Sequence, residues 1–208
     1  MRTILCFGDS NTYGESPEGF GRYERHERWT GRLQAALGEG YLVIEEGLNG
    51  RTTVWEDPVE GDKCGKKHLP VCLETHAPLD LVILMLGTND LKARFSATPT
   101  DVAKGAEALL RMILRADNGR RAQPPKVLLV SPIHLRATTF LGEVFGDRRA
   151  DSMRLAALYA AAAERNVAAY MDAAQFAQAS TLDGLHLDRD GHASLAAAFE
   201  NEIRQIFC

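Results

Sequence analysis

The chain has 208 residues, a length that suits one large domain with a continuous apolar core. Hydrophobic residues make up 45% of the chain and charged residues 25%, which is the balance of a soluble globular protein. The formal net charge of −4 argues against a general nucleic-acid binder, because such proteins carry a basic stripe. No apolar stretch approaches the length of a membrane span.

Short apolar runs alternate along the chain with stretches of helical spacing. In chain order, the patterns predict strands over 3–7, 41–44, 79–86, 126–130 and 167–171, and helices over 29–37, 102–114, 148–165 and 190–206. Segments 51–78 and 134–147 look irregular and are candidate pocket walls or subunit contacts. Alternating strands and helices predict one α/β domain over 1–208, with a mainly parallel sheet between two helical layers.

Cysteines and histidines give no sign of a metal or disulfide site. Cys6, Cys64, Cys72 and Cys208 are scattered without the paired spacing of a metal site, and the histidines show no such spacing either. Cys64 and Cys72 could in principle form a disulfide, but a reducing compartment would keep them apart. The opening apolar run over 3–7 is too short for a signal-peptide core. We therefore expect free thiols in a cytoplasmic protein that uses no cofactor and no metal.

The first strand leads directly into Gly8, Asp9 and Ser10. Ligands of open parallel sheets bind at the carboxyl ends of the strands, so Ser10 is displayed where chemistry takes place. A serine there acts as a nucleophile only if a base removes its proton during attack. Alternatively, Ser10 is a turn or helix-capping serine. The elbow of the α/β-hydrolases, with glycines two residues before and after the serine, is absent because Thr12 occupies the second position.

Asp183 and His186 lie three residues apart, shortly before the last predicted helix. Residues at this spacing on a turn share a side, so Asp183 can accept a hydrogen bond from Nδ1 of His186 and stabilise its imidazolium form. Gly184 between them permits a tight turn. A capping role explains Asp188 or Asp190 well, but it explains Asp183 less well, since Asp183 lies several residues ahead of the helix.

Two further strand ends carry candidate oxyanion donors. Asn89 follows the most hydrophobic strand, and its side-chain amide can donate to a developing oxyanion; an Asx turn is the alternative. Gly50, after the second strand, can add a backbone N–H, because a residue without a β-carbon allows substrate to approach closely.

Taken together, four blocks resemble the SGNH, or GDSL-like, hydrolase family: GDSNTYG at 8–14, GLNGRT at 47–52, GTND at 87–90 and DGLH at 183–186. They occur in the family's order and span almost the whole chain. The second block, with Arg51, Thr52 and Thr53, is most similar to bacterial arylesterases and acyltransferases of this family. The resemblance implies a flavodoxin-like three-layer fold with a five-stranded sheet.

The resemblance also implies site residues and an activity. Ser10, Asp183 and His186 would be catalytic, and the N–H groups of Ser10 and Gly50 with the side chain of Asn89 would form the oxyanion hole. The expected reaction is metal-free hydrolysis of small aryl or short-chain acyl esters through an acyl-enzyme, with transfer to an alcohol or peroxide as a further activity. Related arylesterases often assemble, so a homo-oligomer is expected. The apolar segment 140–145 is a candidate contact surface, with ordinary packing onto the domain as the alternative. Expected substrate contacts are Asn11, Thr88, Lys92, Leu185 and Trp55.

Other functions remain open at this point. The same catalytic set serves carbohydrate acetylesterases, lysophospholipases and thioesterases. A non-enzymatic alternative is a flavodoxin-like module that binds a phosphorylated ligand, but the carboxylate of Asp9 after the first strand would repel a phosphate. A catalytically inactive interaction protein is disfavoured by the presence of all four blocks.

Overall fold

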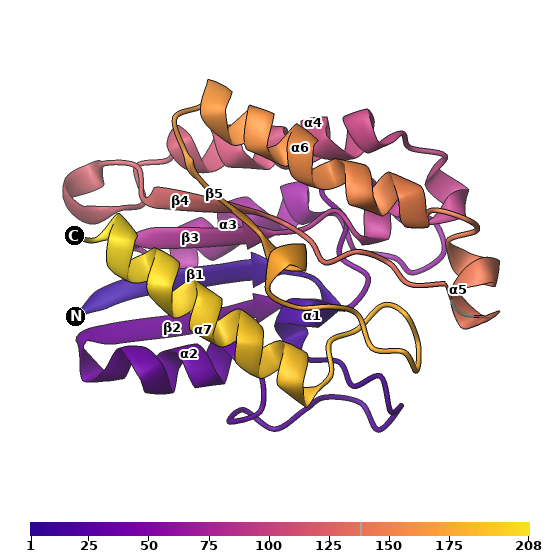
Figure 1. Ribbon diagram of the computed structural model, residues 1–208. Coiled ribbons are helices and arrows are strands. Elements are labelled where there is room, and N and C mark those ends of the chain that lie inside the picture. The colour runs from indigo at the N-terminus through magenta and orange to yellow at the C-terminus, as the bar shows by residue number, and fades with distance from the viewer. Residues whose placement is uncertain (138) are drawn as a thin grey trace.

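The computed structural model describes residues 1–137 and 139–208, and for 139–141 the backbone alone. Its centre is a sheet of five parallel strands in the order β2-β1-β3-β4-β5 (Figure 1). The strands are β1 (Arg2–Gly8), β2 (Tyr41–Gly47), β3 (Leu81–Met85), β4 (Lys126–Ser131) and β5 (Ala169–Asp172). The predicted parallel sheet is confirmed.

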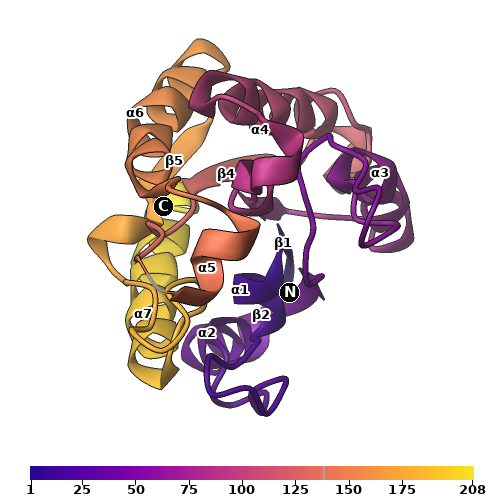
Figure 2. The ribbon, with the colours of Figure 1, turned by 90° about the vertical axis from the view of Figure 1, so that its right-hand side faces the viewer.

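Helices cover both faces of this sheet (Figures 1 and 2). One face carries α2 (Trp29–Leu37) and α7 (Arg189–Ile206), and the other carries α3 (Gly65–Thr75), α4 (Pro99–Leu114) and α6 (Arg149–Arg165). Two short helices, α1 (Ser10–Tyr13) and α5 (Thr139–Val144), follow β1 and β4. Single 3₁₀ turns lie at Gly38–Gly40, Asn89–Leu91, Ala93–Phe95, Arg120–Ala122 and Ala173–Gln175. The three-layer α/β/α fold is confirmed.

Alternation along β1 divides the interior into two cores. Ile4 and Cys6 face the core under α2 and α7, whereas Leu5 and Phe7 face the core under α3, α4 and α6. All four side chains are fully buried. Because both faces of a parallel sheet are covered, such strands appear in the sequence as continuous apolar runs.

The irregular appearance of 51–78 and 134–147 concealed two helices. In α3 the buried Leu69, Cys72 and Leu73 have helical spacing, but Pro70 lies among them and obscures the pattern. In the second segment α5 replaces the expected loop, and Phe145 just after it is only 2% exposed, packed into the core. Phe145 therefore offers no contact surface. The side chains of Phe140 and Leu141, from the same expected surface, lie outside the described residues.

Other boundaries shift by a few residues for local reasons. Helix α4 begins earlier than predicted, since Thr98 and Asp101 form a reciprocal capping box around Pro99. Strand β5 begins later, because Val167 has a positive φ of 54° and lies outside the sheet. Within 1–137 and 139–208, every helix is too short or too polar to cross a bilayer.

Candidate active site

The loops that follow β1, β2 and β3 leave the sheet side by side, at the carboxyl ends of the strands. In the register of the sheet, Gly8 at the end of β1 lies beside Gly47 of β2 and Met85 of β3. The segments that follow these strands contain Ser10, Gly50 and Asn89, so the topology brings them to the same edge. Figure 1 shows α1 at this end of the strands, beside the loop that precedes α7.

The loop before α7 brings His186 to Ser10. His186 Nε2 lies 3.0 Å from Ser10 Oγ, and His186 Nδ1 lies 2.6 Å from Asp183 Oδ2. Ser10 is 5% exposed, and the side chains of His186 and Asp183 are 14% and 15% exposed. Hydroxyl, imidazole and carboxylate therefore form a continuous hydrogen-bonded chain that is partly accessible to solvent.

The carboxylate of Asp183 is stabilised in its charged form. Burial by itself raises the pKa of Asp183, but hydrogen bonds from the His186 side chain and from the N–H groups of Leu185 and His186 outweigh it, and the net pKa is lowered. The two N–H groups donate to Oδ1 at 2.9 and 3.0 Å, which leaves Oδ2 directed at the imidazole. A charged, oriented carboxylate keeps the Nδ1 proton of His186 in place.

Asn11 ties the histidine loop to α1. Its side-chain Nδ2 donates to the carbonyl oxygen of Leu185 at 3.2 Å, and its Oδ1 accepts from the N–H of Leu187 at 2.9 Å. These contacts lie on either side of His186. Asn11 is only 3% exposed, and both ends of its amide bind the histidine loop, so it holds this loop in addition to the substrate contact expected of it.

Asp9, rather than Ser10, caps α1. Its side chain accepts from the N–H of Asn11 at 3.0 Å. Burial raises the pKa of Asp9 to about 6 despite this hydrogen bond, and Thr88 is buried beside it. Capping leaves Ser10 as the first helical residue, with its hydroxyl free to meet His186. Asp9 is a functional residue that the sequence analysis missed, although an aspartate two positions before Asn11 fits a capping pattern.

The candidate oxyanion donors are linked through Arg51. Asn89 Nδ2 donates to the carbonyl oxygen of Arg51 at 3.2 Å, and an amide NH₂ has a second hydrogen left for a ligand. Gly50, the preceding residue, has a φ of +79°, which favours glycine. The guanidinium of Arg51 is buried over the Phe7 ring and donates to the carbonyl oxygens of Gly8, at 2.9 Å, and of Glu46. No sequence pattern indicated this role for Arg51.

Asp90 also binds the loop that follows β2. Its carboxyl group accepts from the N–H of Thr53 at 3.0 and 3.1 Å and from the Thr53 hydroxyl. Burial raises the pKa of Asp90 to about 7, against the effect of these hydrogen bonds. The loops after β2 and β3 are thus joined at two places, by Asn89 with Arg51 and by Asp90 with Thr53.

The remaining expected substrate contacts are largely buried. Lys92 is 4% exposed, and its Nζ lies 2.5 Å from Glu60 Oε1 and 3.6 Å from Asp57 Oδ2. Leu185 is 9% exposed, and Trp55 is half-buried against the core under α3, α4 and α6. Lys92 is therefore buried and bound to two carboxylates within the protein. This differs from the substrate contact expected for it.

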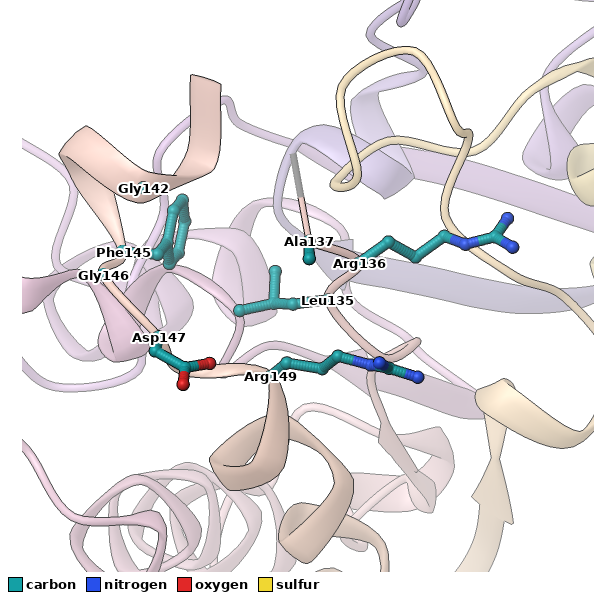
Figure 3. Close-up of a pocket in the computed structure, with 8 residues that line it drawn as sticks. All are labelled: Leu135, Arg136, Ala137, Gly142, Phe145, Gly146, Asp147 and Arg149. Atoms are coloured by element: carbon teal, nitrogen blue, oxygen red, sulfur yellow. The ribbon is translucent and has the colours of Figure 1, made fainter. Parts of the chain in front are cut away.

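A cavity of about 360 Å³ lies near the histidine loop (Figure 3). It is lined by Leu135, Arg136, Ala137, Gly142, Phe145, Gly146, Asp147 and Arg149. Figure 3 shows Arg136 and Arg149 extending in the same direction, away from Phe145. The N–H of Arg136 donates to the carbonyl oxygen of Gly184 at 2.9 Å, so one wall of the cavity is attached to the loop that bears Asp183 and His186.

Among the described residues, no group of three or more histidine, cysteine, aspartate or glutamate side chains is arranged to hold a metal ion. All four cysteines are unpaired, with Cys6, Cys64 and Cys72 buried and Cys208 exposed. His192 on α7 is also buried, where it accepts a hydrogen bond from the N–H of Trp29 at 3.2 Å. Asp188 caps α7, which matches the capping role considered for it.

Comparisons with known proteins agree with this geometry. An aryl esterase from M. smegmatis is 39% identical, with 99% of each chain covered and a TM-score of 0.93. A carbohydrate acetylesterase from Sinorhizobium meliloti is 37% identical, with 99% of this chain and 100% of that chain covered and a TM-score of 0.95. No curated protein matches the chain. The GDSL-like Lipase/Acylhydrolase family matches residues 6–194. The chain therefore belongs to the GDSL-like lipase/acylhydrolase family, and it is a serine ester hydrolase, as its sequence predicted.

Proposed function

We propose that the chain hydrolyses small aryl or short-chain acyl esters with Ser10 as nucleophile, His186 as general base and Asp183 as the residue that orients His186. The 3.0 Å contact between Ser10 Oγ and His186 Nε2, continued at 2.6 Å to Asp183, is the observation that carries the proposal. An ester carbonyl placed against Ser10 is attacked by Oγ while Nε2 takes the hydroxyl proton.

The tetrahedral oxyanion is held by the N–H groups of Ser10 and Gly50 and by Asn89 Nδ2. Collapse of the intermediate breaks the bond to the leaving oxygen, which takes the proton from His186 Nε2. Water then attacks the acyl group on Ser10, with His186 again accepting a proton, and the acid is released. An alcohol or peroxide in place of water gives acyl transfer, so we include transferase activity in the proposal.

Similarity to an aryl esterase supports small aryl esters as the substrate class. Deacetylation of carbohydrates is the second candidate, favoured by the similarity to a carbohydrate acetylesterase. The two differ in the alcohol that leaves, so a comparison of phenyl acetate with acetylated sugars separates them. Higher kcat/KM on acetylated sugars would replace the first candidate by the second.

We also propose that residues 1–208 act as one domain and work as a homo-oligomer in the cytoplasm. The single sheet with its two helical layers supports the first statement. The homo-oligomer rests on the resemblance to arylesterases alone. The four unpaired cysteines support a cytoplasmic location, since a reducing compartment keeps thiols free.

Sedimentation of the purified chain tests the homo-oligomer, and a monomer at micromolar concentration would refute it.

The central experiment follows hydrolysis of p-nitrophenyl acetate and butyrate by the wild type and by Ser10→Ala. A fluorophosphonate should label the wild type at Ser10 and leave the variant unlabelled. Ser16, a buried serine in the segment that follows α1, provides the matched control, and Ser16→Ala should keep the labelling. Full esterase activity in Ser10→Ala would refute the assignment of the nucleophile.

A further inference from the structure

A carboxylate lies against Gly50. Glu60 Oε2 is 2.3 Å from the point where a β-carbon on residue 50 would sit. Because residue 50 is glycine, this carboxylate reaches the backbone whose N–H we assign to the oxyanion hole. An unscreened negative charge at this place opposes the negative charge that develops on the substrate oxygen.

Two cations hold the other oxygen of the same carboxylate. Lys92 Nζ lies 2.5 Å from Glu60 Oε1, and Arg94 lies 3.1 Å from it. The Lys92 side chain is 5% exposed and that of Arg94 is 25% exposed, so water screens the Lys92 charge least. Lys92 belongs to the turn that bears Asn89, whose carbonyl oxygen accepts from its N–H at 3.2 Å.

Two more charged side chains complete the cluster. Asp57 lies 3.6 Å from Lys92 and 3.1 Å from Arg94, with its side chain fully buried. The Cε atom of Lys63 is 3.4 Å from the same β-carbon point on Gly50. The cluster thus consists of Asp57, Glu60, Lys63, Lys92 and Arg94, and removal of any one charge changes the field at Gly50 in a direction fixed by its sign.

We propose that Lys92 is an electrostatic positioning residue, which neutralises Glu60 so that the oxyanion hole beside Gly50 can accept negative charge. This inference rests on the proposed function, and it replaces substrate contact as the role of Lys92. Glu60 in turn joins the loop after β2 to the turn after β3. The charge on the substrate oxygen develops only in the transition state, so the pair acts on kcat rather than on ground-state binding.

The test compares kcat for p-nitrophenyl acetate in Lys92→Met, Glu60→Gln and the double variant. Lys92→Met should lower kcat by roughly tenfold. One unit charge about 5 Å from a developing oxyanion changes the rate by at least that factor under protein-like screening. Glu60→Gln should raise kcat, and the double variant should lie near the wild type. A merely structural ion pair predicts that both single variants lose activity, which would overturn the proposal.

Exposed Lys67, paired with Glu56 at 2.7 Å, provides the matched control. Lys67→Met should leave kcat unchanged, and an equal loss there would overturn the proposal. If Lys92→Met does not fold, as judged by its thermal melt, Arg94→Met takes its place and should lower kcat in the same direction. Glu60→Gln then still decides, because a fall in its kcat contradicts the electrostatic role. Failure of Ser10→Ala to abolish turnover would instead refute the proposed function, so the two failures are distinguishable.

Discussion

Replacement of Asn11 by alanine tests how the histidine loop is held against the serine. The variant loses the hydrogen bonds to the carbonyl oxygen of Leu185 and from the N–H of Leu187, on either side of His186. Each hydrogen bond contributes about 1 kcal/mol, and each backbone group left buried without a partner costs more, so Asn11→Ala should lower the free energy of unfolding by about 2–4 kcal/mol. Urea denaturation measures this loss.

The loop keeps other anchors in this variant. The N–H of Ser180 donates to the carbonyl oxygen of His186 at 2.7 Å, and the N–H of Arg136 donates to that of Gly184 at 2.9 Å. We therefore expect a displaced loop rather than an unfolded one. A displacement of about 1 Å costs about 100-fold in rate, so kcat should fall by roughly 10- to 100-fold with little change in KM.

Ester hydrolysis and the rate of fluorophosphonate labelling provide the assay. Asn166 is the matched control, because both ends of its amide are also bonded, away from the site: Nδ2 donates to Glu107 at 2.9 Å and to Ala162 at 2.8 Å, and Oδ1 accepts from Arg111 at 3.2 Å. Asn166→Ala should lose stability but keep kcat. A rise in KM at constant kcat in Asn11→Ala would refute the reasoning and leave substrate contact as the role of Asn11.

Three further predictions concern the site and the core. Asn89→Ala should lower kcat about 10²–10³-fold with KM nearly constant, measured by steady-state kinetics; a change in KM alone would contradict its oxyanion role. Asp183→Asn should lower kcat by about 10⁴-fold, because the amide favours the wrong tautomer of His186; a loss below tenfold would speak against the orienting role. Burial lowers the pKa of His192 from 6.5 to about 4, so below pH 6.5 the unfolded state binds the extra proton. The free energy of unfolding should then fall by up to about 3 kcal/mol between pH 6.5 and pH 4, and equal slopes in wild type and His192→Gln would contradict this.

Local sequence patterns predicted most of the fold and identified the candidate nucleophile. Alternating apolar runs and helical spacing indicated the parallel sheet, since strands buried on both faces are apolar along their length. The three-residue spacing of Asp183 and His186 indicated their hydrogen bond, because it forms within one turn. Features that depend on neighbours in the chain were therefore readable from the sequence alone.

Contacts between distant parts of the chain were decided only by the tertiary structure. Ser10 and His186 are 176 positions apart, and Asn11, expected from the sequence only as a substrate contact, binds the loop on both sides of His186. Glu60 reaches Gly50, and Lys92 reaches Glu60, only because the loops after β2 and β3 leave adjacent strands at the same edge. Burial and pairing of these side chains are set by folding, and no residue pattern along the chain records them.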